Sequence, residues 1–431
     1  MPNFTLRLSA DNDVPPDEAA SSFYWLTDQR SSFTSGLGPS LGKLGPVPER
    51  NIDFVRIALT AFAADRSVLR DGRGSNWNQR QIDLQIPVSD PDCWTAVAKE
   101  LASVLGFLSG DRWTLTFTHE KAPVETVAPT DTSPVPKRVV LLSGGADSAI
   151  GALYSRSLLS QTEHHTLLSH FSNTMLAPIQ RHVTAEIKRL IPGPTQQHVV
   201  VHLGRGSHRI DGRSYPSEPT SRSRSLLFLA LGLAVASIHQ VSLWIPENGF
   251  ASLNPPLGPE RLGSLSTRTT HPAFLKNLSA TLTKTDAHAA IENPFAGSTK
   301  GEMYRRVVDL IGGDEAAAFL GKTHSCALTG QRSHGISAEV PCGICFGCVL
   351  RRASFSASGV VDGTDYISPS SIPVVQKWLD SKSVERPVRN FVRRGVSARD
   401  IISLALPENY PMRDALDLCQ RGIAELRSLN L

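Results

Sequence analysis

The amino-acid sequence predicts an α/β protein in which a parallel sheet carries helices on both faces. One observation supports this sheet, and two others predict the regions before and after it. Between residues 139 and 245, short apolar strands alternate with helical patterns, as in repeated βαβ units. Residues 1–121 show strand-like alternation and predict an N-terminal α+β domain. Residues 359–431 are polar with amphipathic periodicity, which predicts a helical C-terminal tail.

The N-terminal domain is predicted to contain three strands and one helix. Alternating patterns at residues 4–8, 81–87 and 112–118 predict the strands. Asp90 is a suitable N-cap and Pro91 a suitable first helical residue, which predicts a helix between the last two strands. Its apolar face comprises Trp94, Val97, Leu101 and Leu105.

Two segments are expected to lack regular structure. Residues 30–46 are rich in serine and glycine and predict a loop. The glycine spacing around Lys43 does not match a Walker phosphate loop, and no serine or threonine follows the lysine to hold magnesium. Residues 122–136 contain four prolines and few large apolar groups, the composition of a semi-rigid linker. We therefore expect a domain boundary there and a second domain over residues 137–358.

The second domain is predicted from strands that are each followed by a helical pattern. The strands are expected at 139–142, 166–170, 198–203 and 241–245, and the helices at 148–159, 177–190 and 222–238. In such parallel sheets, ligands bind at the carboxyl ends of the strands. We therefore expect the functional residues to follow these strands.

Size, charge and hydropathy narrow the class of protein. A chain of 431 residues exceeds what one hydrophobic core usually supports, so two or three domains are expected. Lysine and arginine number 44 against 40 aspartate and glutamate, which neither indicates nor rules out a nucleic-acid partner. The start of the sequence lacks the pattern of a secretory signal, so a cytoplasmic location is expected. The most apolar stretch, residues 226–238, is too short to cross a bilayer and predicts a buried helix and no membrane partner.

A phosphate-binding loop is predicted where the first strand of the second domain ends. Gly144 and Gly145 allow a sharp turn whose backbone N–H groups face one concavity. Ser148 adds a hydroxyl at the positive end of the following helix. Without a Walker lysine, the loop suits pyrophosphate as a leaving group, and Asp147 is expected either to bind through Mg²⁺ or to cap the helix. The predicted ATP-binding residues here are Ser143, Gly144, Gly145, Ala146, Asp147 and Ser148.

Four of the six cysteines lie between residues 326 and 348 and predict a metal site. Three of them form a CxxCxxC pattern, and the fourth completes the tetrahedral S₄ shell that is typical of structural zinc. Such a closed shell leaves no position for a reactive water. The alternatives are an iron–sulfur cluster, or His324 or His334 in place of one cysteine. The predicted ligands are Cys326, Cys342, Cys345 and Cys348.

These motifs together resemble a known family. Ser-Gly-Gly-x-Asp-Ser after a strand resembles the PP-loop ATP pyrophosphatases, which have an adenine nucleotide alpha hydrolase-like fold and adenylate a carbonyl or carboxylate oxygen. The cysteine pattern, followed by Leu-Arg and preceded by Lys300-Gly-Glu302, resembles QueC, the 7-cyano-7-deazaguanine synthases. That family adenylates 7-carboxy-7-deazaguanine and converts the acyl adenylate with ammonia. The resemblance covers roughly residues 137–355 and implies ATP, Mg²⁺ and structural Zn²⁺ as cofactors.

Further features resemble the QueC-like QatC proteins of bacterial antiphage systems. These features are Arg222-Ser-Arg224, Glu247-Asn-Gly-Phe250, the N-terminal domain and the helical tail. The resemblance implies partner proteins from a defence operon, and an acceptor that is a protein amino terminus rather than ammonia. We assign catalytic roles to Asp147, Ser148, Lys300 and Arg224.

Polar residues near the strand ends are candidate ligands of ATP and of the deazaguanine. Arg222 is expected to bind phosphate, the alternative being a solvated loop. Glu247, Asn248 and Asn254 follow a buried strand and are expected to bind a guanine-like ring, the alternative being Asn-Gly turn chemistry. Arg268 belongs to a polar run that closes over the site or forms a surface loop.

The expected function is an ATP-dependent ligase that forms an acyl adenylate, AMP and pyrophosphate. The alternatives are a free 7-cyano-7-deazaguanine synthase, a tRNA-modifying PP-loop enzyme and a non-catalytic scaffold of a defence complex. A tRNA-thiolating enzyme requires a cysteine that is free of metal, and four of the cysteines are assigned to zinc. The intact loop at residues 143–148 argues against a scaffold.

Overall fold

The computed structural model describes residues 2–11, 13–26, 30–35, 41–70, 79–120, 135–171, 176–194, 197–218, 222–258, 268–328 and 330–429. All but the last two residues of the linker predicted at 122–136 lie outside these ranges. Residues 36–40 of the predicted serine- and glycine-rich loop do so as well.

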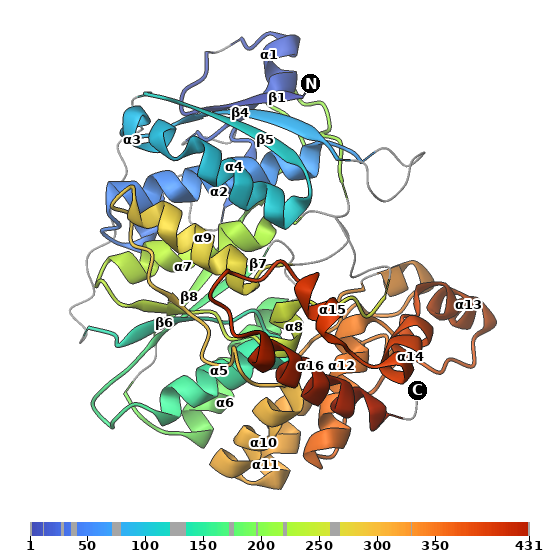
Figure 1. Cartoon of the computed structure of the whole chain (residues 1–431). Helices are drawn as coiled ribbons and strands as arrows, with labels where there is room; N and C mark the ends of the chain where they lie inside the picture. The colour runs from blue at the N-terminus through green and yellow to red at the C-terminus, as the bar shows by residue number, and fades with distance from the viewer. Residues whose placement is uncertain are drawn as a thin grey trace.

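The central sheet has six strands in the order β10-β9-β6-β7-β8-β3 (Figure 1). The strands are β3 (Phe33–Ser35), β6 (Arg138–Leu141), β7 (Thr166–Phe171), β8 (Gln197–Arg205), β9 (Ser242–Trp244) and β10 (Ile291–Glu292). All neighbouring pairs are parallel except β3 with β8, which is antiparallel. The predicted α/β class with a parallel sheet is therefore confirmed.

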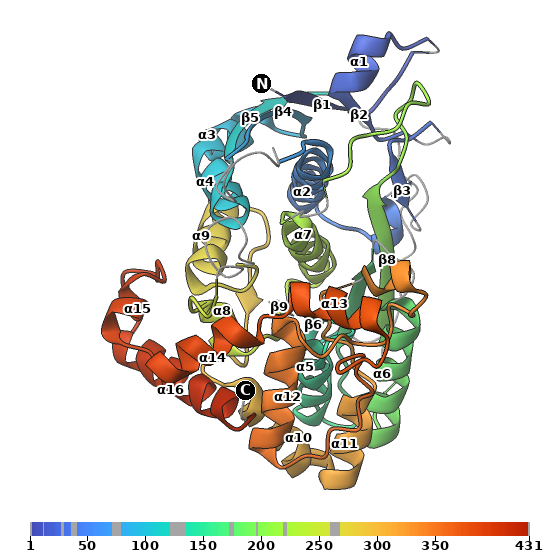
Figure 2. The same cartoon turned by 90° about the vertical axis from the view of Figure 1, so that its right-hand side faces the viewer.

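Helices cover both faces of this sheet (Figure 2). On one face lie α5 (Ala146–Ser157) and α6 (Leu176–Leu190), and on the other lie α7 (Arg224–Ser237) and α9 (Pro272–Thr283). Val139 and Leu141 of β6 belong to the same core as α7, whereas Val140 belongs to the core beneath α5. Because both faces of the strand are buried, its sequence is a continuous apolar run rather than an alternating one.

The N-terminal residues form a second sheet of four parallel strands in the order β2-β1-β4-β5. The strands are β1 (Asn3–Arg7), β2 (Ser22–Tyr24), β4 (Gln81–Pro87) and β5 (Arg112–Thr118). The predicted helix is divided at Val97 into α3 (Pro91–Ala96) and α4 (Ala98–Ser109). The Asp90 side chain accepts the Cys93 N–H at 3.1 Å, which confirms the predicted N-cap.

The N-terminal region and the central sheet share one hydrophobic core. Helix α2 (Glu49–Ser67), which the sequence analysis missed, packs along α7, and the two helices lie between the two sheets (Figure 2). The prediction of a loop over residues 30–46 is wrong at Phe33–Ser35, which forms β3 at the edge of the central sheet. Helix α7 is buried as predicted. Among the residues that the structure describes, no helix combines the length and the hydropathy that a membrane span requires.

The described elements after β10 are all helices, and they fold back onto the central domain (Figure 1). The remaining elements are α1 (Pro16–Ser21), η1 (Leu41–Leu44), α8 (Gly249–Leu253), α10 (Lys300–Ile311), α11 (Gly313–Gly321), η4 (Gly330–His334), α12 (Phe346–Ser358), α13 (Pro373–Lys382), α14 (Glu385–Arg394), α15 (Ala398–Ile402) and α16 (Met412–Arg427). Helices α8, α12, α14 and α16 form a third core, so the predicted helical tail packs against the central domain.

Two buried histidines make the stability of the fold sensitive to acid. The Nε2–H group of His170 donates to the Leu203 carbonyl at 2.7 Å, and that of His271 donates to the Leu404 carbonyl at 2.8 Å. Burial lowers the pKa of both imidazoles to about 4, below the usual 6.5, although the hydrogen bonds to the carbonyls oppose the shift. Both side chains are therefore neutral near pH 7.

The free energy of unfolding should be intact above pH 6.5 and fall as the pH decreases toward 4, because the unfolded chain then binds more protons than the folded chain. The expected loss at pH 5 is about 2 kcal/mol per histidine. Urea unfolding at pH 7 and pH 5 measures it. His271 caps α9, and His271→Asn keeps a cap. This variant should lose less stability between the two pH values than the unchanged protein, and an equal loss would contradict the assignment.

Candidate active site

The predicted phosphate loop connects β6 to α5. Gly144 has φ of 92°, a left-handed conformation that strains any residue with a Cβ. The Ser148 hydroxyl accepts the Ser143 N–H at 3.1 Å and donates to the Gly145 carbonyl at 2.9 Å, which fixes the turn. The N-cap of α5 is Gly145, which has no side chain to accept the first N–H groups, so the positive end of this helix can bind an anion.

A cavity of about 520 Å³ lies beside this loop, at the carboxyl ends of β6 and β9. Its wall comes from the loop, the start of α7, the segment after β9, the start of α10 and the segment around Cys326. The predicted site residues that line it are Ser143, Gly145, Ala146, Asp147, Ser148, Arg224, Glu247, Asn248, Lys300 and the predicted metal ligand Cys326. Residues far apart in the sequence thus meet at the sheet edge where the topology predicts a ligand.

A buried ion pair forms one wall of the cavity. The Lys300 ammonium contacts the Asp147 carboxylate, and each residue is 6% exposed. Asn248 donates to the same carboxylate from its side chain at 2.7 Å and from its backbone N–H at 3.2 Å. Burial opposes ionisation, but the charge of Lys300 outweighs it and lowers the pKa of Asp147. Burial likewise disfavours the charged lysine, but Asp147 raises its pKa. Both groups are therefore charged.

The segment after β9 supplies the polar edge of the cavity. The Asn248 amide donates to Glu247 Oε1 at 2.9 Å, and its carbonyl oxygen accepts the Ala251 N–H at 2.8 Å as the N-cap of α8. Asn248 therefore performs the predicted turn chemistry and also lies in the cavity wall. The Glu247 side chain lies beside it in the cavity wall and also forms a hydrogen bond with the Asp147 side chain.

Four predicted ligand residues do not line the cavity: Gly144, which lies within the loop itself, and Arg222, Asn254 and Arg268. The backbone N–H of Arg222 donates to Asp65 at 2.7 Å, in the N-terminal region. Asn254 ends α8 in a left-handed conformation with φ of 56°. The guanidinium of Arg268 lies 4.7 Å from the centre of the Phe107 ring. Arg222, Asn254 and Arg268 thus have contacts outside the cavity wall, and their roles in binding ATP or substrate stay predictions.

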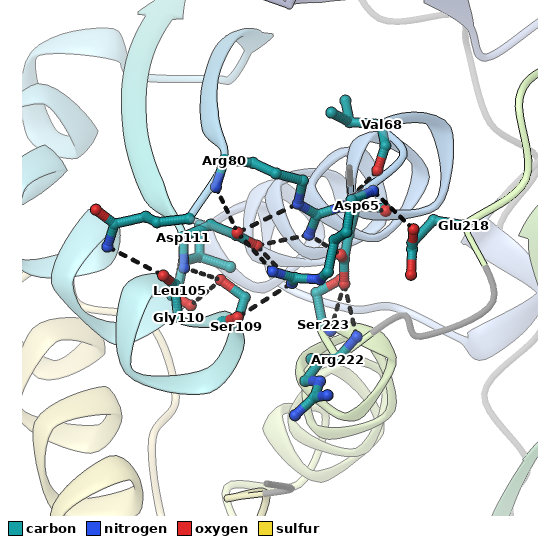
Figure 3. A network of polar contacts seen from close by, with 12 residues as sticks. Asp65, Val68, Arg80, Leu105, Ser109, Gly110, Asp111, Glu218, Arg222 and Ser223 are labelled. Carbon is teal, nitrogen blue, oxygen red and sulfur yellow. Dashed lines mark hydrogen bonds and ion pairs between the residues drawn. The ribbon is translucent and has the colours of Figure 1, made fainter. Parts of the chain in front are cut away.

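Buried charges hold the N-terminal region against the start of α7 (Figure 3). Asp65 Oδ2 accepts the backbone N–H groups of Arg222 and Ser223 at 2.7 and 2.9 Å and the Ser223 hydroxyl at 2.8 Å. Arg80 bonds both Asp65 and Asp111 at 2.5 Å. Because Arg224 is the next residue, these contacts fix the backbone from which its side chain enters the cavity.

Sequence reasoning missed two polar residues of the cavity wall. His324 and Ser325 line the cavity just before Cys326. Within the described part of the chain, His324 Nε2 and Ser325 Oγ are buried without a hydrogen-bond partner. The His324 N–H donates to the Gly144 carbonyl at 2.9 Å and so connects the cysteine segment to the phosphate loop. In the sequence, their position immediately before the metal ligand Cys326 could have indicated that they lie near the site.

The four cysteines meet as predicted. Their Sγ atoms lie within 4.8 Å of one another. The sulfurs of Cys342 and Cys348 are 3.8 Å apart and those of Cys345 and Cys326 are 3.9 Å apart. Four sulfurs at about 2.3 Å from one zinc ion in a tetrahedron lie about 3.8 Å apart, so the set fits a single zinc ion. The N–H of Cys345 donates to Cys342 Sγ at 3.3 Å and supports a thiolate there. Neither His324 nor His334 belongs to this set.

Comparison with known proteins gives one similarity. No protein-family model matches the chain, and no solved structure matches it at a significant level. The chain is 31% identical over 146 residues to a 7-cyano-7-deazaguanine synthase of Myxococcus xanthus (strain DK1622). The match covers 33% of this chain and 55% of that protein, so the chain spans little more than half the length of this relative. Together with the parallel sheet and the loop between β6 and α5, this similarity supports a QueC-like family with a PP-loop for the chain.

Proposed function

We propose that the protein is an ATP-dependent ligase that adenylates the carboxylate of a 7-deazaguanine and then transfers the acyl group to an amine. The observation that carries this proposal is the cavity in which an uncapped helix start, a buried ion pair and the Glu247 carboxylate face one another. The name of the similar synthase supports a 7-deazaguanine as the substrate.

In the first step, a carboxylate oxygen attacks the α-phosphorus of ATP, and the bond to the bridging oxygen of pyrophosphate breaks. The N–H groups at the start of α5 stabilise the departing phosphates, as anions are stabilised at helix N-termini. Arg224 and Lys300 add positive charge at the same cavity. Mg²⁺ that accompanies ATP supplies further charge neutralisation. Asp147 keeps Lys300 charged and fixed within the wall.

In the second step, the amine nitrogen attacks the acyl carbon, AMP leaves and the amine loses a proton. We propose an amino terminus of a partner protein as this amine, within a bacterial antiphage operon. This part of the proposal rests on the resemblance of the two terminal extensions and of Glu247-Asn-Gly-Phe250 to QatC proteins. The second candidate is a free 7-cyano-7-deazaguanine synthase that uses ammonia, which the name of the similar protein favours. Ammonia would first give the primary amide with release of AMP. The amide oxygen would then attack the α-phosphorus of a second ATP, displace pyrophosphate and leave with AMP, while the nitrogen loses its protons and the nitrile forms.

The cysteines argue against a tRNA-thiolating enzyme. Four of them form the metal set. Of the other two, Cys419 is buried in the C-terminal core and Cys93 lies on α3 in the N-terminal region. Neither lines the cavity described beside the phosphate loop.

The test is to incubate the purified protein with ATP, Mg²⁺ and 7-carboxy-7-deazaguanine, adding either ammonia or the neighbouring proteins of its operon. AMP, free nitrile and intact protein masses are followed. AMP with a heavier partner protein would establish the ligase, and AMP with free nitrile would establish the synthase. Absence of AMP under both conditions would reject the adenylation proposal.

A further inference from the structure

The C-terminal helix α16 lies against the element that carries Lys300 (Figure 1). Glu425, near the end of α16, is 7% exposed. Its carboxylate accepts the Gly301 N–H at 3.0 Å and the Thr299 hydroxyl. These two residues flank Lys300, so a side chain of the tail binds the chain on both sides of the lysine.

A second side chain on the same face of α16 binds the same helical turn. Thr299 is the N-cap of α10 and forms a capping box with Glu302. The guanidinium of Arg421 contacts both oxygens of Glu302 at 2.5 and 2.6 Å. Arg421 and Glu425 are four residues apart and thus project from one side of their helix. The first turn of α10 is therefore held by two charged groups of α16.

The fit leaves no room at this contact. A Cβ on Gly301 would lie 2.5 Å from a carboxylate oxygen of Glu425. A Cβ on Gly422 of α16 would lie 2.4 Å from the ring of Phe250, in the helix that Asn248 caps. Helix α16 thus packs on both elements whose side chains bind Asp147.

We propose that Glu425 is a positioning residue that fixes the first turn of α10 and thereby holds the Lys300 ammonium against Asp147 in the cavity wall. No residue of α16 lines that cavity. The C-terminal helix nevertheless determines the geometry of the adenylation site, and this inference rests on the function proposed above.

Glu425→Gln tests this role because it keeps the size of the side chain but turns one acceptor into a donor that faces the Gly301 N–H or the Thr299 hydroxyl. The kcat of AMP formation should fall about 10- to 100-fold, since misplacement of a charged group by about 1 Å has effects of that size. The KM for ATP should change much less. Glu408→Gln, on the exposed surface of the same tail, is the matched control and should leave kcat unchanged.

A double-mutant cycle separates positioning from general destabilisation. In a Lys300→Met background, Glu425→Gln should cause no further loss of kcat, because the residue acts through Lys300. Gly301→Ala places a Cβ 2.5 Å from the Glu425 carboxylate, so it should disturb the same contact and cause a similar loss of kcat. A normal kcat in Glu425→Gln, or losses that multiply in the double variant, would overturn the inference.

A readout that does not need activity distinguishes failure of this inference from failure of the proposed function. Lys300 is 6% exposed and should resist reductive methylation in the unchanged protein. Peptide mass spectrometry should show severalfold faster methylation of Lys300 in Glu425→Gln and no change in Glu408→Gln. Equal methylation in all three proteins would overturn the positioning role, whether or not AMP is formed.

Discussion

Replacement of Lys300 by methionine is expected to lower the kcat of AMP formation strongly, to a residual rate, and to destabilise the fold. The variant leaves the Asp147 carboxylate buried without its counter-charge, which typically costs about 3 to 5 kcal/mol. It also removes a cation from the cavity wall, for which we expect a loss of at least about 100-fold in kcat. Urea unfolding measures the first effect and AMP release under saturating ATP measures the second.

The matched control is the double variant Asp147→Asn with Lys300→Met, in which neither group is charged. It should recover most of the lost free energy of unfolding, because no unpaired charge remains. It should not recover activity. A single variant Lys300→Met with unchanged stability would show that the ion pair does not form, and one with near-normal kcat would remove Lys300 from the proposed chemistry.

Loss of the metal is expected to destabilise the fold strongly. The purified protein should contain one zinc ion and no iron per chain, since the four sulfurs are spaced for a single tetrahedral ion. Structural zinc contributes about 10 kcal/mol or more in small zinc-binding domains, so Cys345→Ser should unfold the segment around the cysteines. Elemental analysis and thermal unfolding measure these outcomes.

The metal should also influence the phosphate loop. The His324 N–H that binds the Gly144 carbonyl lies two residues before the zinc ligand Cys326. We therefore expect chelation or Cys345→Ser to weaken ATP binding, as measured by calorimetry. Cys93→Ser, which lies outside the metal set, is the control and should keep both zinc and ATP affinity. ATP affinity that persists without zinc would show that the two sites are independent.

The parts that the sequence predicts well are those whose information is local. The strand that ends at Leu141, the loop from Ser143 to Ser148 and the CxxCxxC spacing each lie within a few residues, and the structure contains all three. The S₄ set also includes Cys326, because a tetrahedral shell requires a fourth ligand. A motif whose residues are close in sequence and chemically specific can be recognised without knowledge of the rest of the fold.

The direction in which side chains point could not be predicted from the sequence. Arg222 and Arg224 are two residues apart at the start of a helix, yet only Arg224 lines the cavity. The Asp65 carboxylate, 157 residues earlier, fixes the Arg222 N–H and thereby the orientation of the helix start. Strand β3 and helix α2 were missed for a similar reason. Three residues are too few for a periodic signal, and a helix buried on nearly all sides lacks a polar face.

The contact between Glu425 and the start of α10 also determines when, during synthesis of the chain, the site can reach its final geometry. The described residues that line the cavity all lie between Ser143 and Leu350, so they leave the ribosome before α16 does. A nascent chain that has exposed only these residues contains the ATP loop, but it lacks the carboxylate that bonds on either side of Lys300. Catalytic competence should therefore arise only once α16 has been synthesised and has folded onto α10, which would keep chains that still lack α16 from consuming ATP.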